Sequence, residues 1–124
     1  MTEQIIKAFY KVYNELGFGF LEKVYENALW IELRRLGYDV EKQMPITVYY
    51  HEIQVGKYYA DLVVNNGVIL ELKAAKTICY EHECQLINYL KATDMEVGLL
   101  LNFGESPQMK RKVYTNGPRI NLID

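Results

Sequence analysis

Apolar residues recur three and four positions apart in two stretches at the start of the chain, which is the spacing of amphipathic helices. The pattern predicts one helix over residues 5–16 and a second over about residues 20–36. Glycines end both helices, at residues 17–19 and at Gly37, because glycine readily adopts the left-handed backbone that closes a helix. The expected buried stripe of the second helix comprises Leu21, Val24, Tyr25, Ala28, Leu29 and Leu36.

From residue 38 onward the period changes, and β-branched and aromatic residues become frequent, as strands prefer. A further helix is expected over about residues 80–93, and a short strand at Val113 and Tyr114 is left open. The predicted strands are Ile46–Tyr50, Tyr58–Val64, Val68–Lys73 and Val97–Leu101. The order ααβββαβ predicts a mixed α/β (α+β) fold with a central sheet flanked by helices.

The composition is that of a single folded domain over residues 1–124. Half of the residues are apolar and 24% are charged, which excludes a disordered chain. The 14 basic and 16 acidic side chains give a net charge of −2, which argues against a strongly cationic DNA-coating protein but leaves room for a local basic patch.

Targeting signals are not expected either. No run approaches the roughly 18 apolar residues of a membrane-spanning helix, and an acidic residue stands near the N-terminus where a secretion signal would be basic. Cys79 and Cys84 are interpreted as reduced packing residues, because their spacing fits no zinc or iron–sulfur framework. A cytoplasmic location is therefore expected.

Charged residues inside an apolar strand are the first sign of chemistry. Glu71 and Lys73 are two positions apart, so on a strand they point to the same face, while Leu70 and Leu72 point to the other. A charge left unpaired in such a strand would cost several kcal/mol. The segment therefore indicates a polar site on one face of the sheet.

The register of the preceding hairpin decides whether Asp61 joins this site. A two-residue loop would turn Asp61 away from Glu71. A three-residue loop, Asn65-Asn66-Gly67, pairs Val64 with Val68 and hence Asp61 with Glu71, and it gathers the aliphatic residues on the opposite face. We therefore expect the three-residue loop, with its glycine in the left-handed conformation of a bulged turn.

Opposed carboxylates on paired strands lie about 5 Å apart and repel each other unless a cation neutralises them. Carboxylate oxygens favour magnesium or manganese over zinc, and Lys73 beside them can orient a water or stabilise developing negative charge. The alternative is a surface cluster of ordinary ion pairs, each worth about 0–1 kcal/mol. The spacing of Asp61, Glu71 and Lys73 does not decide between the two.

Several segments, in the order found here, resemble those of a known nuclease superfamily. Asp61 followed by Glu71-Leu72-Lys73 resembles the PD-(D/E)XK signature, and Gln85 to Tyr89 resembles the Q-x-x-x-Y element of its RecB-like branch. Residues 17–26 resemble the glycine-rich start and helical glutamate of the small GxxExxR family, and residues 90–103 resemble its closing segment. The chain departs from the pattern where proline, a basic residue and arginine are expected, at Ala60, Tyr59 and Tyr25.

The resemblance implies a restriction endonuclease-like three-layer sandwich that hydrolyses phosphodiester bonds in DNA, in repair, recombination or defence. It also implies a divalent metal, Mg or Mn. The residues that it assigns to the site are the metal ligands Asp61, Glu71 and Leu72 (through its carbonyl), the water-positioning Lys73, the metal-supporting helical acid Glu22, and Gln85 and Tyr89, which brace the site or contact nucleic acid.

Other polar residues have both a structural and a functional interpretation. Glu26 lies one turn beyond Glu22 and is expected to be a solvated helix acid rather than a member of the site. His82, on the same side of its helix as Gln85, is either a phosphate contact, a base or, as we favour, a hydrogen-bonded structural histidine. The triplet Lys110, Arg111 and Lys112 either binds phosphate, with release of counterions, or forms a solvated edge.

A non-catalytic nucleic-acid-binding or protein-interaction module that keeps the same fold is the alternative function. The acidic pI of about 5.7 and the small size support it. A domain of this size offers little surface to hold a duplex, which leaves a homodimer or a partner protein open.

Overall fold

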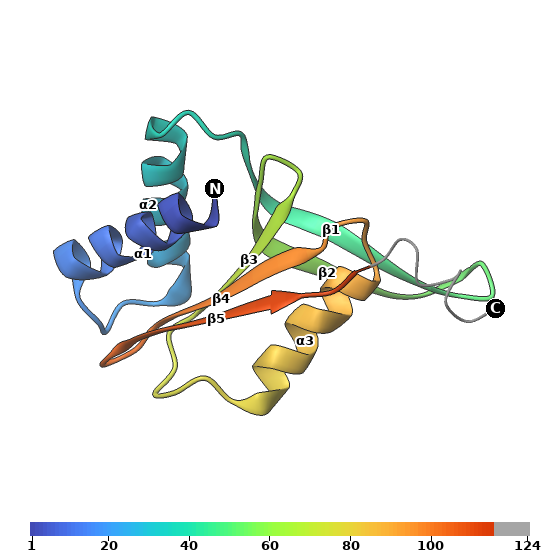
Figure 1. Ribbon diagram of the computed structural model, residues 1–124. Helices are drawn as coiled ribbons and strands as arrows, with labels where there is room; N and C mark the ends of the chain where they lie inside the picture. The colour runs from blue at the N-terminus through green and yellow to red at the C-terminus, as the bar shows by residue number, and fades with distance from the viewer. Residues whose placement is uncertain (116–124) are drawn as a thin grey trace.

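The computed structural model describes residues 1–115 of the chain. A five-stranded sheet with the order β1-β2-β3-β4-β5 lies between α1 and α2 on one face and α3 on the other (Figure 1). The elements are α1 (Thr2–Leu16), α2 (Glu22–Arg35), β1 (Val40–Tyr50), β2 (Ile53–Val64), β3 (Val68–Lys73), α3 (Tyr80–Lys91), β4 (Val97–Phe103) and β5 (Pro107–Val113). The predicted α+β fold with a central mixed sheet is confirmed, with β5 added as a complete strand.

The sheet is mixed, because β3 and β4 run parallel while the other neighbouring pairs are antiparallel. Its strands alternate between two apolar cores. Leu70 and Leu72 of β3 join the core beneath α1 and α2, whereas Ile69 joins the core beneath α3. Glu71 and Lys73, which alternate with the leucines, therefore belong to the α3 face.

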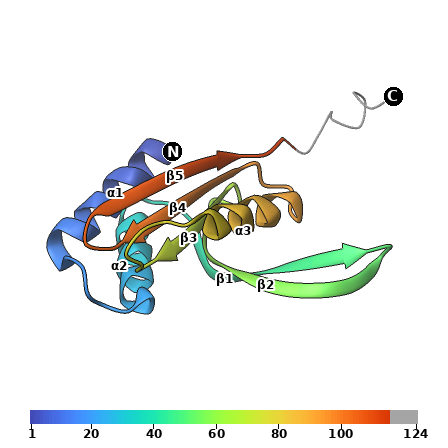
Figure 2. The same cartoon turned by 90° about the horizontal axis from the view of Figure 1, so that it is seen from below.

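The strands β1 and β2 are longer than predicted and extend beyond the body of the sheet as a two-stranded arm, defined here as residues 44–60 (Figure 2). His51 and Glu52 turn the arm with positive φ angles of 49° and 67°, as a two-residue hairpin turn requires. Pro45 is tolerated within β1 because this strand forms an edge of the sheet.

The three-residue loop after β2 is confirmed, since Val64 pairs with Val68 and Leu62 with Leu70. The predicted left-handed glycine is wrong: Asn65 and Asn66 have the positive φ angles, 52° and 53°, and Gly67 does not. The Gly67 N–H donates to the Val64 carbonyl (3.0 Å) and closes the turn around the two asparagines. Asparagine tolerates this backbone because its short polar side chain can hydrogen-bond locally.

The buried stripe predicted for α2 is partly wrong. Leu21, Val24 and Leu36 are exposed, and Leu21 retains 81% of its accessible surface. The buried positions are Tyr25, Glu26, Leu29 and Leu33. The prediction selected the most apolar positions of the helix. It therefore missed Glu26, an acid with polar partners that lies on the packed face of α2.

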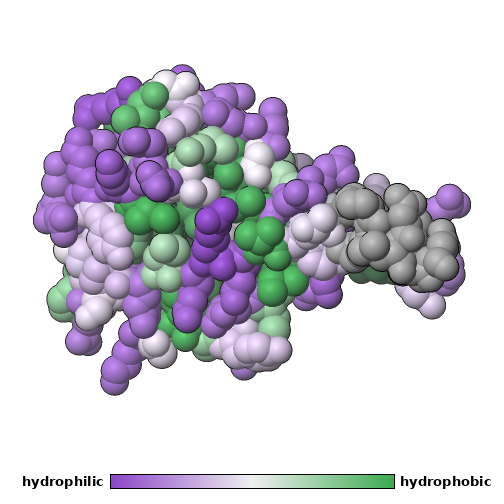
Figure 3. Space-filling model, viewed as in Figure 1, coloured by the Kyte–Doolittle hydropathy of each residue, from purple (hydrophilic) through white to green (hydrophobic). Residues whose placement is uncertain are grey.

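Hydrophilic side chains predominate over the helices at the left of Figure 3, and hydrophobic ones gather toward the middle of the molecule. No helix within residues 1–115 has the length and apolar character that crossing a membrane would require.

Candidate active site

The two predicted acids meet where β2 separates from β3. The backbone pairing of these strands extends from Val64–Val68 to Leu62–Leu70, and the next residues are Asp61 and Glu71. The Asp61 N–H donates to Glu71 Oε2 (2.9 Å), and the Leu72 N–H donates to Asp61 Oδ2 (2.8 Å). Each carboxylate thus accepts a backbone N–H of the opposite strand, in place of the backbone bonds that end there. We call this place the fork.

A slip in the side-chain alternation accompanies the fork. Ala60 and Val63 both belong to the core beneath α3, whereas Leu62 belongs to the opposite core. The alternation therefore shifts by one residue at Asp61. Across from it in β1, Gln43 adopts a left-handed backbone with φ 53°, which is uncommon for a residue other than glycine. The slip coincides with the end of the β2–β3 pairing and with the start of the arm.

Burial makes the acid pair unusual electrostatically. Glu71 is only 5% exposed; burial and, after it, the charge of Asp61 raise the pKa of Glu71 to about 8. Burial also raises the pKa of Asp61 above its usual range, against the opposing effect of the Leu72 N–H bond. A raised pKa favours the protonated form of a carboxyl group, and positive charge beside the pair opposes this effect. The carboxylate oxygens are of the kind that a hard divalent cation prefers, but within residues 1–115 no three His, Cys, Asp or Glu side chains come together as a metal site.

Lys73 supplies part of that positive charge. Its ammonium group lowers the pKa of both Asp61 and Glu71, although burial dominates in each. No ion pair involving Lys73 is found within residues 1–115. The alternative of an exposed cluster of ordinary ion pairs is therefore wrong, because the acids are largely buried and the lysine is not paired with them.

The structure brings Glu22 to the end of β3. Glu22 is the first residue of α2, and its Oε2 accepts the Ala74 N–H (3.2 Å), one residue beyond Lys73. Its charge also contributes to the raised pKa of Glu71. Tyr25 fixes the approach to this helix, since its hydroxyl donates to the Gly17 carbonyl (2.6 Å) and accepts the Phe20 N–H (3.2 Å). The glycine-rich segment thus sets where Glu22 lies.

Two residues near the fork were missed by sequence reasoning. Glu26, expected to be solvated, is only 4% exposed. Gln43 Nε2 donates to Glu26 Oε1 (2.8 Å) and to Asp61 Oδ1 (3.4 Å), while Lys23 pairs with Glu26 Oε2 (3.0 Å). The spacing of Glu26 one turn beyond Glu22 was the available signal for the acid. Nothing local in the sequence marks Gln43.

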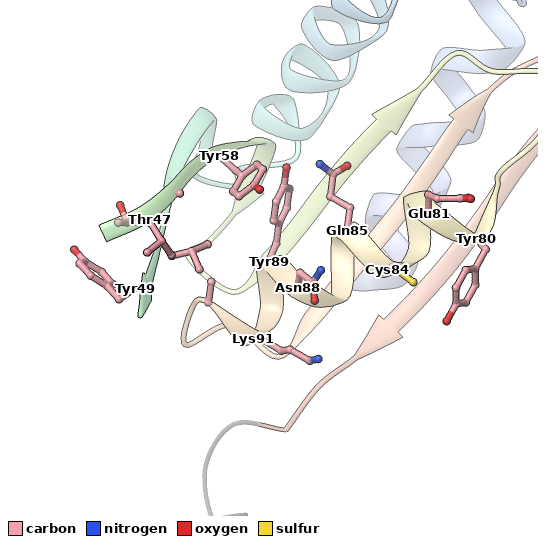
Figure 4. A pocket seen from close by; sticks show the side chains of 14 residues that line it. Thr47, Tyr49, Tyr58, Tyr80, Glu81, Cys84, Gln85, Asn88, Tyr89 and Lys91 are labelled. Carbon is pink, nitrogen blue, oxygen red and sulfur yellow. The ribbon is translucent and has the colours of Figure 1, made fainter. Parts of the chain in front are cut away.

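The α3 face contributes Gln85 and Tyr89. Both point to the same side of α3 in Figure 4, and the Tyr89 ring lies 5.7 Å from the Tyr58 ring of the arm. Burial and then the charges of Glu71 and Asp61 raise the pKa of Tyr89 to about 12. The Tyr89 hydroxyl is therefore within electrostatic reach of both acids.

The remaining candidates lie in structural contacts. His82 Nδ1 accepts the Cys79 N–H (3.4 Å) at the start of α3, as expected of a structural histidine. Lys112 pairs with Glu83 of α3 (2.6 Å), and Lys110 and Arg111 are exposed on β5. Within residues 1–115 none of these side chains forms an ion pair or hydrogen bond with the acids of the fork.

Comparison with known proteins places this arrangement in context. A family model described as the PD-(D/E)XK nuclease superfamily matches residues 1–114. Among solved structures, the crystal structure of SSO0001 is similar, with a TM-score of 0.62 and 16% sequence identity, which bears on the fold alone. The match covers 80% of this chain, but the chain spans only 53% of that structure. No curated protein matches. The extent of the family match shows that the chain belongs to the PD-(D/E)XK nuclease superfamily.

Proposed function

We propose that the chain is a single nuclease domain over residues 1–124 that hydrolyses phosphodiester bonds in DNA with Mg or Mn. The observation that carries the proposal is the buried, reciprocally bonded pair Asp61 and Glu71, with Lys73 on the same sheet face and not ion-paired within the described chain. The affiliation with the GxxExxR family and the RecB-like branch, a role in repair, recombination or defence, and a cytoplasmic location remain parts of this proposal.

Asp61, Glu71 and the Leu72 carbonyl would hold the metal ion. When bound, the ion would polarise the scissile phosphate and lower the pKa of a water. Carboxylates held by backbone N–H groups are pre-positioned for this, because one oxygen of each is already fixed by the opposite strand. Gln43 holds the second Asp61 oxygen and fixes the orientation of that carboxylate.

The other residues act on the substrate and the water. The Lys73 ammonium group would stabilise the charge that develops on the phosphate or orient the attacking water. Glu22, bonded to the backbone just after Lys73, would support the metal directly or through water. Gln85 and Tyr89 would brace the site or contact nucleic acid from α3. A homodimer or partner protein would enlarge the surface available to DNA.

A non-catalytic binding module is the second candidate function. Lys112 is paired with Glu83 rather than available to phosphate, and the exposed Tyr59 stands where a basic residue is expected. Such a module would bind nucleic acid or a protein without cleaving DNA.

Cleavage of supercoiled plasmid in Mg or Mn tests the proposal, with Lys73→Ala as the diagnostic variant. We expect this variant to bind the metal nearly as the parent does but to cleave at least about a hundredfold more slowly, because an electrostatic contact made in the transition state is lost. Lys7→Ala, at an exposed position of α1, is the matched control and should cleave normally. A Lys73→Ala protein as active as the parent would contradict the proposal.

A further inference from the structure

A groove of about 800 Å³ runs between the arm and α3 (Figure 4). The arm contributes Thr47 to Tyr49, Val55, Gly56 and Tyr58, and α3 contributes positions from Tyr80 to Lys91 along its whole length. A helix of this length extends about 18 Å. The groove therefore extends along α3, and the arm forms its other wall.

Two residues of the groove connect it to the candidate active site, although Asp61, Glu71 and Lys73 do not themselves line it. Tyr89 lines the groove and belongs to the same core cluster as Ile69 of β3. Glu71 and Lys73 follow Ile69 on that face of the sheet. Gln85, also assigned to the site by resemblance, lines the groove one turn earlier on α3. A chain that lies in the groove would lie against Tyr89, which is near enough to Glu71 and Asp61 for their charges to raise its pKa.

The walls of the groove are aromatic and neutral. Tyr49, Tyr58, Tyr80 and Tyr89 line it, and the first three are exposed. The amide groups of Gln85 and Asn88 lie among them. Glu81 and Lys91, the charged residues of the lining, cancel each other. Ring faces and amides suit flat, polar-edged groups such as nucleic-acid bases, which stack on aromatic side chains.

We infer that this groove binds a short single-stranded segment of DNA, whose bases stack on the groove tyrosines while its backbone reaches Asp61 and Glu71. The inference rests on the proposed nuclease function and names its substrate class. A stacked strand advances 3.4 Å per nucleotide, so a groove of about 18 Å holds roughly five nucleotides. In a duplex the base faces are covered by neighbouring base pairs and are not free to stack on side chains.

Two pairs of adjacent tyrosines on the arm provide matched variants. Tyr49 and Tyr58 line the groove, whereas their neighbours Tyr50 and Tyr59 do not, and all four are exposed to a similar degree, between 46% and 66%. Binding is measured by fluorescence anisotropy with a labelled oligothymidylate of about ten nucleotides, in a Lys73→Ala background that prevents cleavage. Melting temperatures establish that each variant is folded.

We expect Tyr49→Ala and Tyr58→Ala each to weaken binding at least about fivefold, the loss of one stacking contact. Tyr50→Ala and Tyr59→Ala should bind as the parent, and Tyr58→Phe, which keeps the ring, should bind nearly as well. Because Lys91 is the one basic residue in the described lining, the slope of log affinity against log salt should be shallow, at about −0.7.

Equal losses at the lining and non-lining tyrosines, or preference for a duplex of the same sequence, would overturn the inference. Displacement of the oligonucleotide by an extended peptide that depends on the same tyrosines would also overturn it, in favour of a protein-binding groove. The two proposals fail separately. If the protein cleaves duplex DNA and replacing Tyr49 or Tyr58 has no effect, the nuclease proposal holds and the groove proposal fails. If the parent protein, with Lys73 in place, binds the single strand through these tyrosines but does not cleave it, the groove proposal holds and the nuclease proposal fails.

Discussion

The two edges of β3 differ. On one edge, backbone hydrogen bonds join the strand to β4 along its whole length, from Val68–Val97 to Lys73–Asn102. On the other edge, pairing with β2 stops at Leu62–Leu70, and the carboxylates of Asp61 and Glu71 accept the next backbone N–H groups. Burying carboxylates costs several kcal/mol, so continued backbone pairing, as at the β4 edge, is the more stable way to extend a sheet. The comparison indicates that the fork gives up stability to hold two acids in a fixed arrangement.

The largest effect is expected from removing one acid of the fork. Metal that binds the folded protein alone should stabilise the parent by about 2.7 kcal/mol at a hundredfold excess over its dissociation constant, or about 8 °C in melting temperature. Asp61→Ala should lose this shift and DNA cleavage together. Asp94→Asn, at an exposed position away from the fork, should retain both. A full metal-induced shift in Asp61→Ala would show that the ion binds elsewhere.

Gln43→Ala should produce the next largest effect, since it removes the donor shared by Asp61 and Glu26. Leaving buried acceptors unpaired should lower the free energy of unfolding by about 1–3 kcal/mol. Loss of a group that orients a metal ligand should weaken metal binding at least about tenfold. Urea unfolding and a manganese titration measure the two effects, with Gln54→Ala on the exposed arm as control. Unchanged metal affinity would make Gln43 merely structural.

The stability of the metal-free protein should depend on pH, because Glu71 is buried at the β2 edge of β3. Folding raises the pKa of Glu71 from its ordinary 4.5 to about 8, so the folded state holds this proton more tightly. The resulting stability is complete below about pH 4.5 and is lost as the pH rises through 8. Melting temperatures in a chelator should fall over this window, and the fall should be smaller in Glu71→Gln than in the exposed control Glu41→Gln. Equal falls in both variants would contradict the assignment.

A small effect is expected at the turn that sets the register of the fork. Asn66→Ala places a residue that has a Cβ but no polar side-chain group in the left-handed region, and should cost about 1 kcal/mol. Gly67→Ala should be nearly neutral, because Gly67 lacks a positive φ and an added Cβ meets no atom closer than 3.6 Å. Chemical denaturation measures both. A larger loss of unfolding free energy in Gly67→Ala than in Asn66→Ala would contradict this and favour the left-handed glycine expected from the sequence.

The structural features that could be predicted from the sequence are those set by the pattern of neighbouring residues. Alternation of apolar residues in β2 and β3 sufficed for the three-residue loop and for the approach of Asp61 to Glu71. Helix spacing with glycine boundaries located α1 and α2 to within a few residues. The acids of the fork could be named because charges in an apolar strand are costly.

The remaining features depend on non-local contacts. Glu26 is buried because Gln43 and Lys23 satisfy its oxygens, and neither partner is signalled by an apolar or polar pattern. The separation of β2 from β3 follows from the slip at Asp61 and the left-handed Gln43, which a regular two-residue period cannot express. The groove exists only because the arm bends over α3, so its tyrosines could not be grouped from the sequence.

Anomalous scattering from a crystal soaked in manganese tests the shared ion at the fork most directly. We expect a manganese peak bonded at about 2.0–2.6 Å to a carboxylate oxygen of Asp61 and to one of Glu71. A map in which these carboxylates keep only their backbone hydrogen bonds, with no manganese between them at saturating concentration, would contradict it.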